Sequence, residues 1–282
     1  EYQENIFVGN VMTSRINRDV MRYEGSSPKA KEASDFVVSS DPWFRPVDLR
    51  WGPDGAMYVA DFYNKIIGHY EVPLDHPKRD RKRGRIWRIT YNGDNESQRW
   101  NYPRLNLSKD NIHSAVSELS SHNKTRRLLS LNYLVDQHPN RAIGEFNKIL
   151  SNEFSPSMAR PLALWGLERL GQLSDARILN AMVDKQENMR VQAFKICAER
   201  PDISQVLSRS LAQGIRDRSP MVQRVAAAAL SSHPESKYLR LLLEFKSEIP
   251  QKDDHLAHRV KLSLRQIVKT LDNYQLVKEL FS

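Results

Sequence analysis

Cysteine is almost absent from this sequence, and long apolar runs do not occur in it at all. Cys197 is the only cysteine among 282 residues, which excludes an internal disulfide, a cysteine-rich zinc site and a CxxCH haem attachment within the chain. It lies in an apolar stretch with helical spacing, where a buried structural thiol is expected. No stretch approaches the roughly 20 apolar residues that a membrane-spanning helix needs. We therefore expect no transmembrane segment.

Acidic residues are also in deficit, because 43 lysines and arginines face 34 aspartates and glutamates, for a formal net charge of +9. Much of the excess lies in residues 78–88, which carry seven basic side chains against Asp80 alone. A nucleic-acid binder more often spreads its charge along a face with aromatic residues interleaved, so we expect no nucleic-acid partner. A solvated loop is the first interpretation of 78–88. Two other roles of this segment remain as alternatives. One is docking to an acidic protein surface, and the other is weak, salt-sensitive binding of nucleic acid or anionic lipid.

Glycine and tryptophan are scarce beyond the first hundred residues, which hold seven of the 11 glycines and four of the five tryptophans. Residues 46–51 alternate between apolar and polar, 56–60 read as the returning strand, and the sequence Gly-Pro-Asp-Gly at 52–55 predicts a tight turn between them. Short strands joined by such turns favour an all-β sheet, sandwich or propeller. The other strand-like stretches are 6–8, 16–22, 36–38 and 84–90.

From Ile112 onward the apolar period becomes helical and an internal repeat is visible. Five segments align on an arginine, at steps of 33, 30, 34 and 35 residues. Helix pairs repeated at about this spacing are typical of an α-solenoid. The fourth residue after each arginine is mostly apolar and is expected to be buried. The aligned arginines are Arg127, Arg160, Arg190, Arg224 and Arg259, and the expected buried residues are Leu131, Leu164, Phe194 and Ala228.

Second helices are expected between the arginine-bearing ones, near 140–150, 175–184, 203–215 and 236–246. Two Ser-Pro pairs, at 155–156 and 219–220, predict a serine N-cap followed by proline at the first helical position. We expect the aligned arginines to be structural and to pair with acidic residues in an adjoining turn. The candidates for this pairing are Asp184, Glu187 and Asp217.

The stretch from Asp41 to Tyr63, with Gly68-His69, His76-Pro77 and Gly84–Ile89 behind it, resembles a known family. It is similar to the membrane-bound dehydrogenases of planctomycetes, verrucomicrobia and some bacteroidetes. The propeller of that family is similar to glucose/sorbosone dehydrogenases and to NHL-type propellers. The family order is propeller, HEAT repeats and often a c-type cytochrome module. The resemblance covers about residues 41–90.

The resemblance implies a β + α multidomain fold: a partial β-propeller of about one and a half blades, then a HEAT-like α-solenoid of about five helical pairs. The expected domains are 1–95 as the C-terminal part of the propeller, 96–110 as a connector and 111–282 as the solenoid. The chain would be a segment of a larger bacterial protein. An extracytoplasmic or periplasmic location follows from the resemblance alone.

The expected function is the structural and docking segment of an extracytoplasmic dehydrogenase of this type, with redox or sugar-handling chemistry elsewhere. The name dehydrogenase rests on fold analogy in this family, so it assigns no activity to this segment. No catalytic residues are identifiable in the segment. We expect no cofactor here, with haem c or a quinone only in other parts of the parent protein. The partner would be another protein or a downstream cytochrome-like module. The alternative is a stand-alone protein–protein interaction scaffold with no redox role.

The candidate ligand-binding residues lie in and after the family-like stretch. Arg45 and Tyr63 flank the strand pair and would suit an anionic or sugar ligand, whereas Asp61 also suits side-chain bonds to the backbone. His69 and His76 fall in a long loop, but their spacing matches no standard metal-ligand pattern, so no metal site is expected. The candidates are thus Arg45, Asp61, Tyr63, His69 and His76.

Overall fold

A computed structural model describes residues 2, 4–68, 71–91, 104–107 and 111–271 of the chain. The chain divides into two compact units. The first contains residues 1–22, 29–114 and 121–129, and the second contains 23–28, 115–120 and 130–282. Residue His69, one of the candidates above, and most of the expected connector lie outside the described residues.

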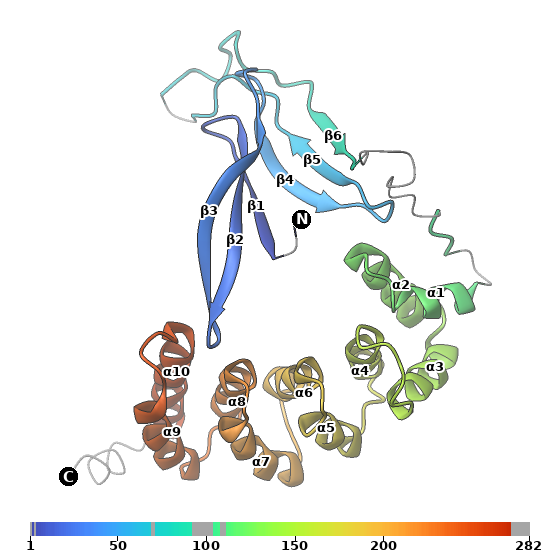
Figure 1. Ribbon diagram of the computed structural model, residues 1–282, viewed down its shortest axis with the longest axis vertical. Helices are drawn as coiled ribbons and strands as arrows, with labels where there is room; N and C mark the ends of the chain where they lie inside the picture. The colour runs from blue at the N-terminus through green and yellow to red at the C-terminus, as the bar shows by residue number, and fades with distance from the viewer. Residues whose placement is uncertain (1, 3, 69–70, 92–103, 108–110, 272–282) are drawn as a thin grey trace. The chain divides into compact units, whose positions relative to one another are not determined.

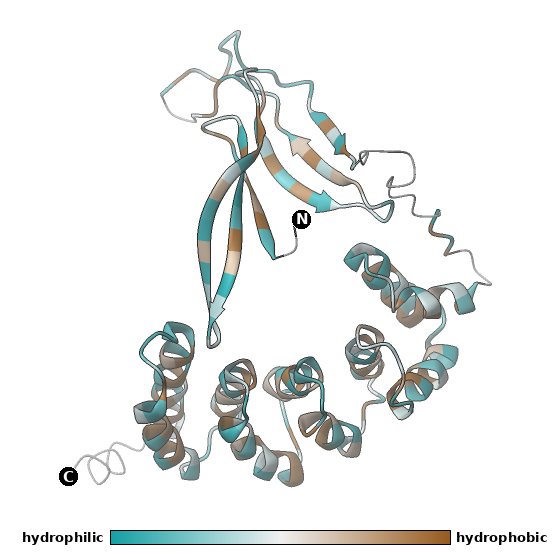
Figure 2. Cartoon of the chain, in the orientation of Figure 1, coloured by the Kyte–Doolittle hydropathy of each residue, from teal (hydrophilic) through white to brown (hydrophobic). Residues whose placement is uncertain are grey.

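Six strands form two three-stranded sheets, with orders β1-β2-β3 and β4-β5-β6. The pairing of β1 with β2, of β4 with β5 and of β5 with β6 is antiparallel. Hydrophilic and hydrophobic residues alternate along β4, whereas β5 is mostly apolar, as Figure 2 shows. The strands are β1 (Asn5–Asn10), β2 (Arg15–Glu24), β3 (Ser27–Val38), β4 (Pro46–Trp51), β5 (Met57–Asp61) and β6 (Arg85–Ile89).

The expectation of a partial β-propeller is wrong. A propeller blade is a four-stranded sheet, whereas the described residues form two sheets of three strands each and show no blade pattern. Every strand overlaps a predicted stretch, because alternation and turn residues are local signals, but β3 begins at Ser27 and not near the predicted residue 36. How many strands share a sheet depends on pairings that the local pattern does not carry. The solenoid part of the expected fold is compatible with the helices described below.

The strands of the first unit share one small apolar core. Ile16, Phe44, Met57 and Val59 are buried in it, and partly buried residues of β1, β3, β4 and β6 pack against them. Gly9 on β1 allows a close approach to β4, since a Cβ there would lie 2.4 Å from the carbonyl oxygen of Pro46. The predicted turn is present, with Gly55 at φ +80°. The core therefore fixes β4 and β5, and with them Asp61 at the end of β5, Arg45 directly before β4 and Tyr63 directly after β5.

The described residues also contain ten α-helices and one 3-10 helix. Figure 1 shows α4, α6, α8 and α10 along one side of a curved row, with α3, α5, α7 and α9 along the other. The bounds are α1 (Ile112–Glu118), α2 (Lys124–Gln137), α3 (Pro139–Ser151), α4 (Ala159–Arg169), α5 (Asp175–Met182), α6 (Glu187–Glu199), α7 (Gln205–Leu211), η2 (Ala212–Arg216), α8 (Pro220–Ser232), α9 (Lys237–Glu248) and α10 (Asp254–Leu271).

Small residues let the helices of this row pack closely. The third residue after each arginine in α4, α6 and α8 is an alanine that is fully buried. Leu131, Leu164 and Phe194 are buried as expected, but Ala228 is only partly buried, so that prediction is wrong for the fourth repeat. Gly166 serves the same purpose in α4, because a Cβ there would meet the ring of Phe146.

The two predicted N-caps have different outcomes. Ser219 caps α8 and its hydroxyl accepts a hydrogen bond from the Val222 amide, with proline at the first helical position. The helix expected after Ser155-Pro156 instead begins at Ala159, because Pro156 lies in a preceding turn whose carbonyl accepts from the Ala159 amide. Cys197 on α6 is fully buried as expected, and burial raises the pKa of its thiol to about 12.

Candidate functional site

Asp61 is the centre of the polar cluster in the first unit. It ends β5 and is buried, and its Oδ1 accepts hydrogen bonds from the backbone amides of Arg45 (2.8 Å) and Tyr63 (2.9 Å). Its Oδ2 accepts from Arg85 Nε (2.7 Å) and from the Trp87 indole (2.9 Å). Burial alone would raise the pKa of Asp61, but these four donors together hold it below its ordinary value. A carboxylate that is ionised near neutral pH thus ties the ends of β4, β5 and β6 together.

Arg85 extends this cluster toward the surface. Its Nη2 donates to Asp41 Oδ2 at 3.0 Å, and its guanidinium carbon lies 4.1 Å from the ring centroid of Tyr63 and 5.1 Å from that of Trp87. The Tyr63 ring also packs against Trp43, with centroids 5.2 Å apart. The result is a layered arrangement of aromatic rings and a guanidinium, which is a stable cation–π geometry. Trp87 stays 45% exposed at its edge.

Arg45 is committed to protein oxygens. Its Nε donates to the carbonyl of Asn64, Nη1 to the carbonyl of Val11 and the hydroxyl of Ser14, and Nη2 to the carbonyl of Lys65. The side chain is buried, with 8% of its surface exposed. Arg45 therefore closes the loop after β5 onto the turn between β1 and β2. An anionic ligand at this guanidinium would have to displace those oxygens.

His76 lies in a separate, more open place in the same loop. Its Nδ1 accepts a hydrogen bond from the Lys78 amide at 3.1 Å. Together with Trp43 it lines a hollow of about 390 Å³ that is rich in basic residues. Asp80 organises that hollow, because its carboxylate accepts from the amides of Lys82 and Arg83 and from Arg83 Nε at 2.6 Å. Within the described ranges no group of three or more His, Cys, Asp or Glu side chains could hold a metal ion.

The structure thus brings Arg45, Asp61 and Tyr63 together. The hollow beside His76 adjoins them through Trp43 and through Arg83, whose guanidinium carbon lies 5.8 Å from the ring centroid of Tyr63. Three members of the cluster were not among the predicted site residues: Asp41, Arg85 and Trp87. The sequence did hold a signal for them. Asp41 lies in the family-like stretch, and Arg85 and Trp87 are two residues apart on a predicted strand, so their side chains share one face of β6. The charged residues here neutralise one another, which is the ordinary arrangement of a structural polar cluster.

A second set of buried charges joins successive helices of the row. Arg160 on α4 donates through both terminal nitrogens to Asp184, which lies just before α6, at 3.2 and 2.5 Å. Arg190 on α6 donates to Asp217, just before α8, at 2.7 and 3.0 Å. We call each of these pairs a rung. The predicted pairing with acidic residues is confirmed for Arg160 and Arg190, and neither pair includes Glu187. The first aligned arginine, Arg127, instead donates to the backbone carbonyls of Ser121 and His122.

Each rung also organises the start of the next helix. Asp184 accepts from the Gln186 amide and Asp217 from the Ser219 amide, both at 2.8 Å. The side chains of Arg190 and Asp217 are only 6% and 12% exposed, so this pair is largely desolvated. The hydrogen bonds that Arg190 donates to the Asp217 carboxylate raise the pKa of Arg190 in spite of its burial. A bidentate guanidinium–carboxylate pair of this kind has one favoured geometry, so a rung sets the angle between neighbouring helices.

The third rung is different, because a peptide occupies it. Arg224 on α8 should pair with Asp253, which precedes α10, but its Nη1 donates to the backbone carbonyl of Ser26 at 2.8 Å. Asp253 accepts from the Ser26 amide (2.6 Å) and from the hydroxyls of Ser26 (2.9 Å) and Ser27 (2.7 Å). Residues 23–28, the turn between β2 and β3, belong to the second unit together with these helices. The peptide at Ser26 therefore replaces a direct ion pair.

The fit of this turn is close. Ser26 and Ser27 are fully buried, and Asp253 is 1% exposed. Gly25 has φ +64°, and a Cβ at this position would lie 2.2 Å from Asp253 Oδ2, so any other residue would collide with the carboxylate. Burial alone would raise the pKa of Asp253, but the donors from Ser26, Ser27 and Leu256 hold it below its ordinary value.

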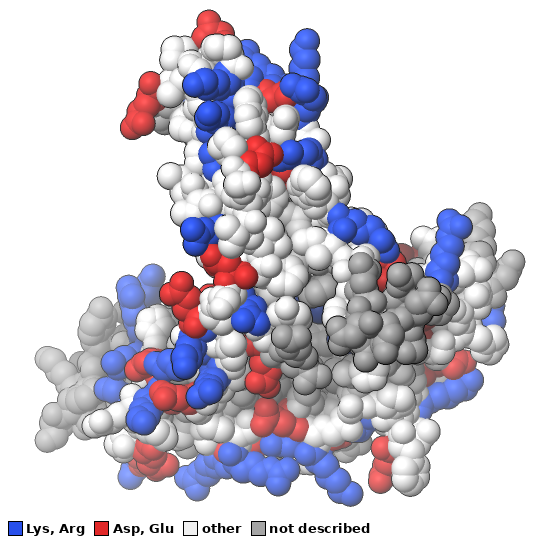
Figure 3. Space-filling model, turned by 45° about the horizontal axis from the view of Figure 1, so that its top comes forward, with Lys and Arg blue, Asp and Glu red and all other residues white. Residues whose placement is uncertain are grey.

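In comparison with known proteins, residues 1–93 match a family described as a domain of unknown function, DUF7133. No curated protein matches the chain. Across the described residues, no helix combines the length and the apolar character that crossing a membrane requires. On the face drawn in Figure 3, lysines and arginines are interspersed with aspartates and glutamates.

Proposed function

We propose that this chain is a docking module, in which the row of helices holds turns of polypeptide in its Arg–Asp rungs. The observation that carries this proposal is the seating of the Ser26 peptide in the Arg224–Asp253 rung, where amide, carbonyl and two hydroxyls are all bonded. A rung that accepts the backbone of a turn recognises shape and hydrogen bonding more than sequence. Such recognition suits a scaffold.

The cluster around Asp61 supports the same proposal rather than a catalytic one. Its carboxylate is saturated by four donors, and Arg45 is bonded on all of its nitrogens. General acid–base catalysis needs a group that is poised to exchange a proton with a substrate. Asp61, held ionised and buried, is not poised in this way. The candidates of the first unit are therefore proposed to maintain the structure that presents the turn at 23–28.

The resemblance to membrane-bound dehydrogenases supplies a setting for this module. In that setting the chain is the docking segment of an extracytoplasmic redox or sugar-handling protein, and the haem c or quinone belongs to other parts of the parent. The partner is then another protein or a cytochrome-like module. A stand-alone interaction scaffold is the competing setting, and both share the docking role. The match to a domain of unknown function over 1–93 favours neither setting.

A peptide added in trans tests the docking role. In the variant Gly25→Val the chain's own turn is expected to leave the rung, because the new side chain meets Asp253. A labelled peptide that copies residues 23–31 should then bind this variant, with binding followed by fluorescence anisotropy or by NMR at millimolar peptide. The wild-type chain should bind it at least about tenfold more weakly, because its tethered turn competes at a high effective concentration.

The matched control is the double variant Gly25→Val, Asp253→Asn. It should lose peptide binding, since the charged acceptor of three hydrogen bonds is replaced by an amide. Equal binding of the peptide to all three proteins, or no binding to the Gly25→Val chain, would contradict the proposal. Circular dichroism of the helical signal confirms that both variants keep the helices.

A further inference from the structure

The last arginine of the repeat, Arg259 on α10, lacks the aspartate partner that Arg160 and Arg190 have within the described residues. Arg160 and Arg190 each bond an aspartate, and Arg224 bonds the Ser26 carbonyl. Arg259 donates from Nη2 to the Ser231 hydroxyl at 3.3 Å, and its buried Nε has no acceptor within the described residues. Arg160 also has a buried Nε without a partner, but both of its terminal nitrogens lie on Asp184.

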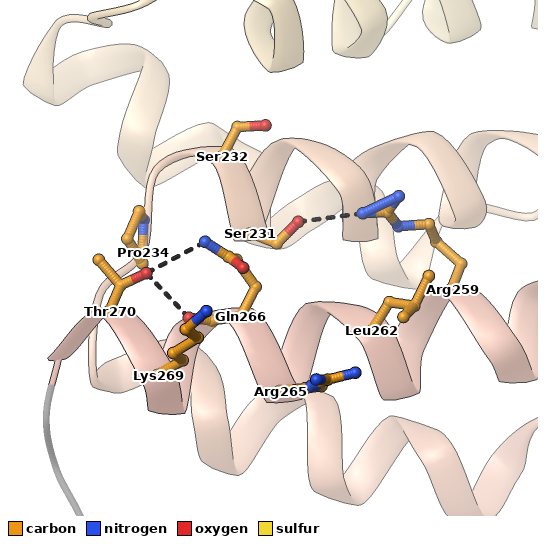
Figure 4. Close-up of a pocket in the computed structure, with 9 residues that line it drawn as sticks. All are labelled: Ser231, Ser232, Pro234, Arg259, Leu262, Arg265, Gln266, Lys269 and Thr270. Carbon is orange, nitrogen blue, oxygen red and sulfur yellow. Dashed lines mark hydrogen bonds between the residues drawn. The ribbon is translucent and has the colours of Figure 1, made fainter.

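The surroundings of Arg259 form an open groove. It has a volume of about 570 Å³ and runs between the C-terminal end of α8 and the side of α10. Figure 4 shows Arg259 beside Ser231 at one end and Gln266, Lys269 and Thr270 at the other. The lining residues are Ser231, Ser232, Pro234, Arg259, Leu262, Arg265, Gln266, Lys269 and Thr270.

The charge of the groove has one sign. Three of its lining side chains are cations and none is acidic, and neither Arg265 nor Lys269 has an ion-pair partner in the described part of the chain. Burial without a carboxylate lowers the pKa of Arg259, yet an arginine keeps its charge in proteins. A desolvated guanidinium that keeps its charge gains most from a bidentate carboxylate. The hydroxyls of Ser231 and Thr270 offer further polar contacts to such a ligand.

We propose that this groove binds an aspartate-bearing turn of a partner protein, with the carboxylate on Arg259 and the acidic surroundings of that turn on Arg265 and Lys269. The inference rests on the docking role proposed above and names the chemistry of the partner. The chain itself provides the template, because Asp184 and Asp217 occupy the same position relative to the arginines of α4 and α6. The partner would thus add the next rung to the row.

The test uses the whole chain labelled with ¹⁵N-arginine, observed through the side-chain Nε–H signals. The probe is a capped peptide that copies Val183–Met189, which contains Asp184 and Glu187, and its control carries Asp184→Asn. We expect saturable shifts of the Arg259 signal with the first peptide and binding weaker by about tenfold or more with the control, as the loss of a charge-assisted pair implies. Sodium sulfate is titrated separately as the inorganic anion.

Two variants separate the specific site from general charge attraction. Arg259→Gln should weaken binding of the aspartate peptide by about tenfold or more. Arg240→Gln should leave it unchanged, because Arg240 is an exposed residue of the neighbouring helix α9, with 81% of its side chain accessible. Arg259→Lys keeps the charge without the guanidinium fork and should give an intermediate affinity.

Three results would overturn this inference. They are undiminished binding to Arg259→Gln, equal binding of the Asp184→Asn peptide, and saturation by sulfate alone while the peptide fails to bind. The last result would make the groove a site for small inorganic anions. Failure here is distinct from failure of the docking role, which is measured at Asp253 with a different peptide and a different variant.

Discussion

Replacing Asp61 with alanine is expected to lower the free energy of unfolding of the first unit by about 3–5 kcal/mol, the range found when one partner of a buried ion pair is removed. The substitution leaves Arg85 and the Trp87 indole without their acceptor, together with two backbone amides. Arg85 keeps Asp41 at 3.0 Å, which limits the loss of its charge partner. The buried amides of Arg45 and Tyr63 have no such replacement.

Amide hydrogen exchange in β5 and β6 measures this effect. A single melting temperature would mix the two compact units, whose unfolding need not be one transition. The matched control is Asp48→Ala on β4, whose side chain is 52% exposed and pairs with exposed Arg50, so a change within about 0.5 kcal/mol is expected. Similar exchange rates in both variants would show that the Asp61 cluster does not stabilise the sheet.

Replacing Asp217 with asparagine is expected to have a comparable effect on the row of helices, about 3 kcal/mol or more. The substitution removes the negative charge beside the guanidinium of Arg190, 6% exposed, and leaves it only neutral acceptors, which are one side-chain amide oxygen and the carbonyl oxygens of Asp184 and Lys185. It also weakens the hydrogen bond to the Ser219 amide at the start of α8. The loss of stability should therefore be largest in α6 and α8, because this rung joins these two helices.

Hydrogen exchange in α6 and α8 is again the measurement, and a double-mutant cycle with Arg190→Met isolates the pair. The control is Asp136→Asn, whose partner Arg169 is 39% exposed and whose own side chain is 54% exposed. Exposed pairs of this kind contribute at most about 1 kcal/mol. Equal effects of Asp217→Asn and Asp136→Asn would mean that the rungs do not hold the helices.

Much of the secondary structure could be predicted from the sequence, because the signals are local. Alternation and the turn at 52–55 located the strands, and the arginine register located α4, α6, α8 and α10. The N-cap at Ser219 followed from the Ser-Pro pair, whereas the same pair at 155–156 formed a turn. Helix ends depend on the packing of the flanking turn, which a dipeptide does not specify.

The arrangement of the sheets was not predictable in this way. Whether six strands form blades or two three-stranded sheets depends on pairings between distant residues and on close approaches such as Gly9 to Pro46. The resemblance favoured a propeller, and the sheet order excludes it for the described residues. The length of β3 was also underestimated, because its charged first half lacks an apolar alternation.

The candidate residues show the same division between local and long-range information. Asp61 was expected to bond the backbone, and it does so, but its links to Arg85 and Trp87 come from β6 and depend on the register of the sheet. The rungs at Asp184 and Asp217 were predictable from the repeat. The contact between Ser26 and Asp253 was not, because 227 residues separate them.

The exchange rate of the Ser26 amide proton tests the docking account most directly. The account predicts strong protection, because this buried amide donates to the carboxylate of Asp253 at 2.6 Å. Since the pKa of Asp253 is lowered in the folded chain, its contribution is complete above the ordinary aspartate pKa of about 3.9 and is lost as the pH falls through the lowered value. Protection should therefore fall in acid and in the Asp253→Asn variant. Exchange of Ser26 at the rate of an unstructured peptide near neutral pH would contradict the account.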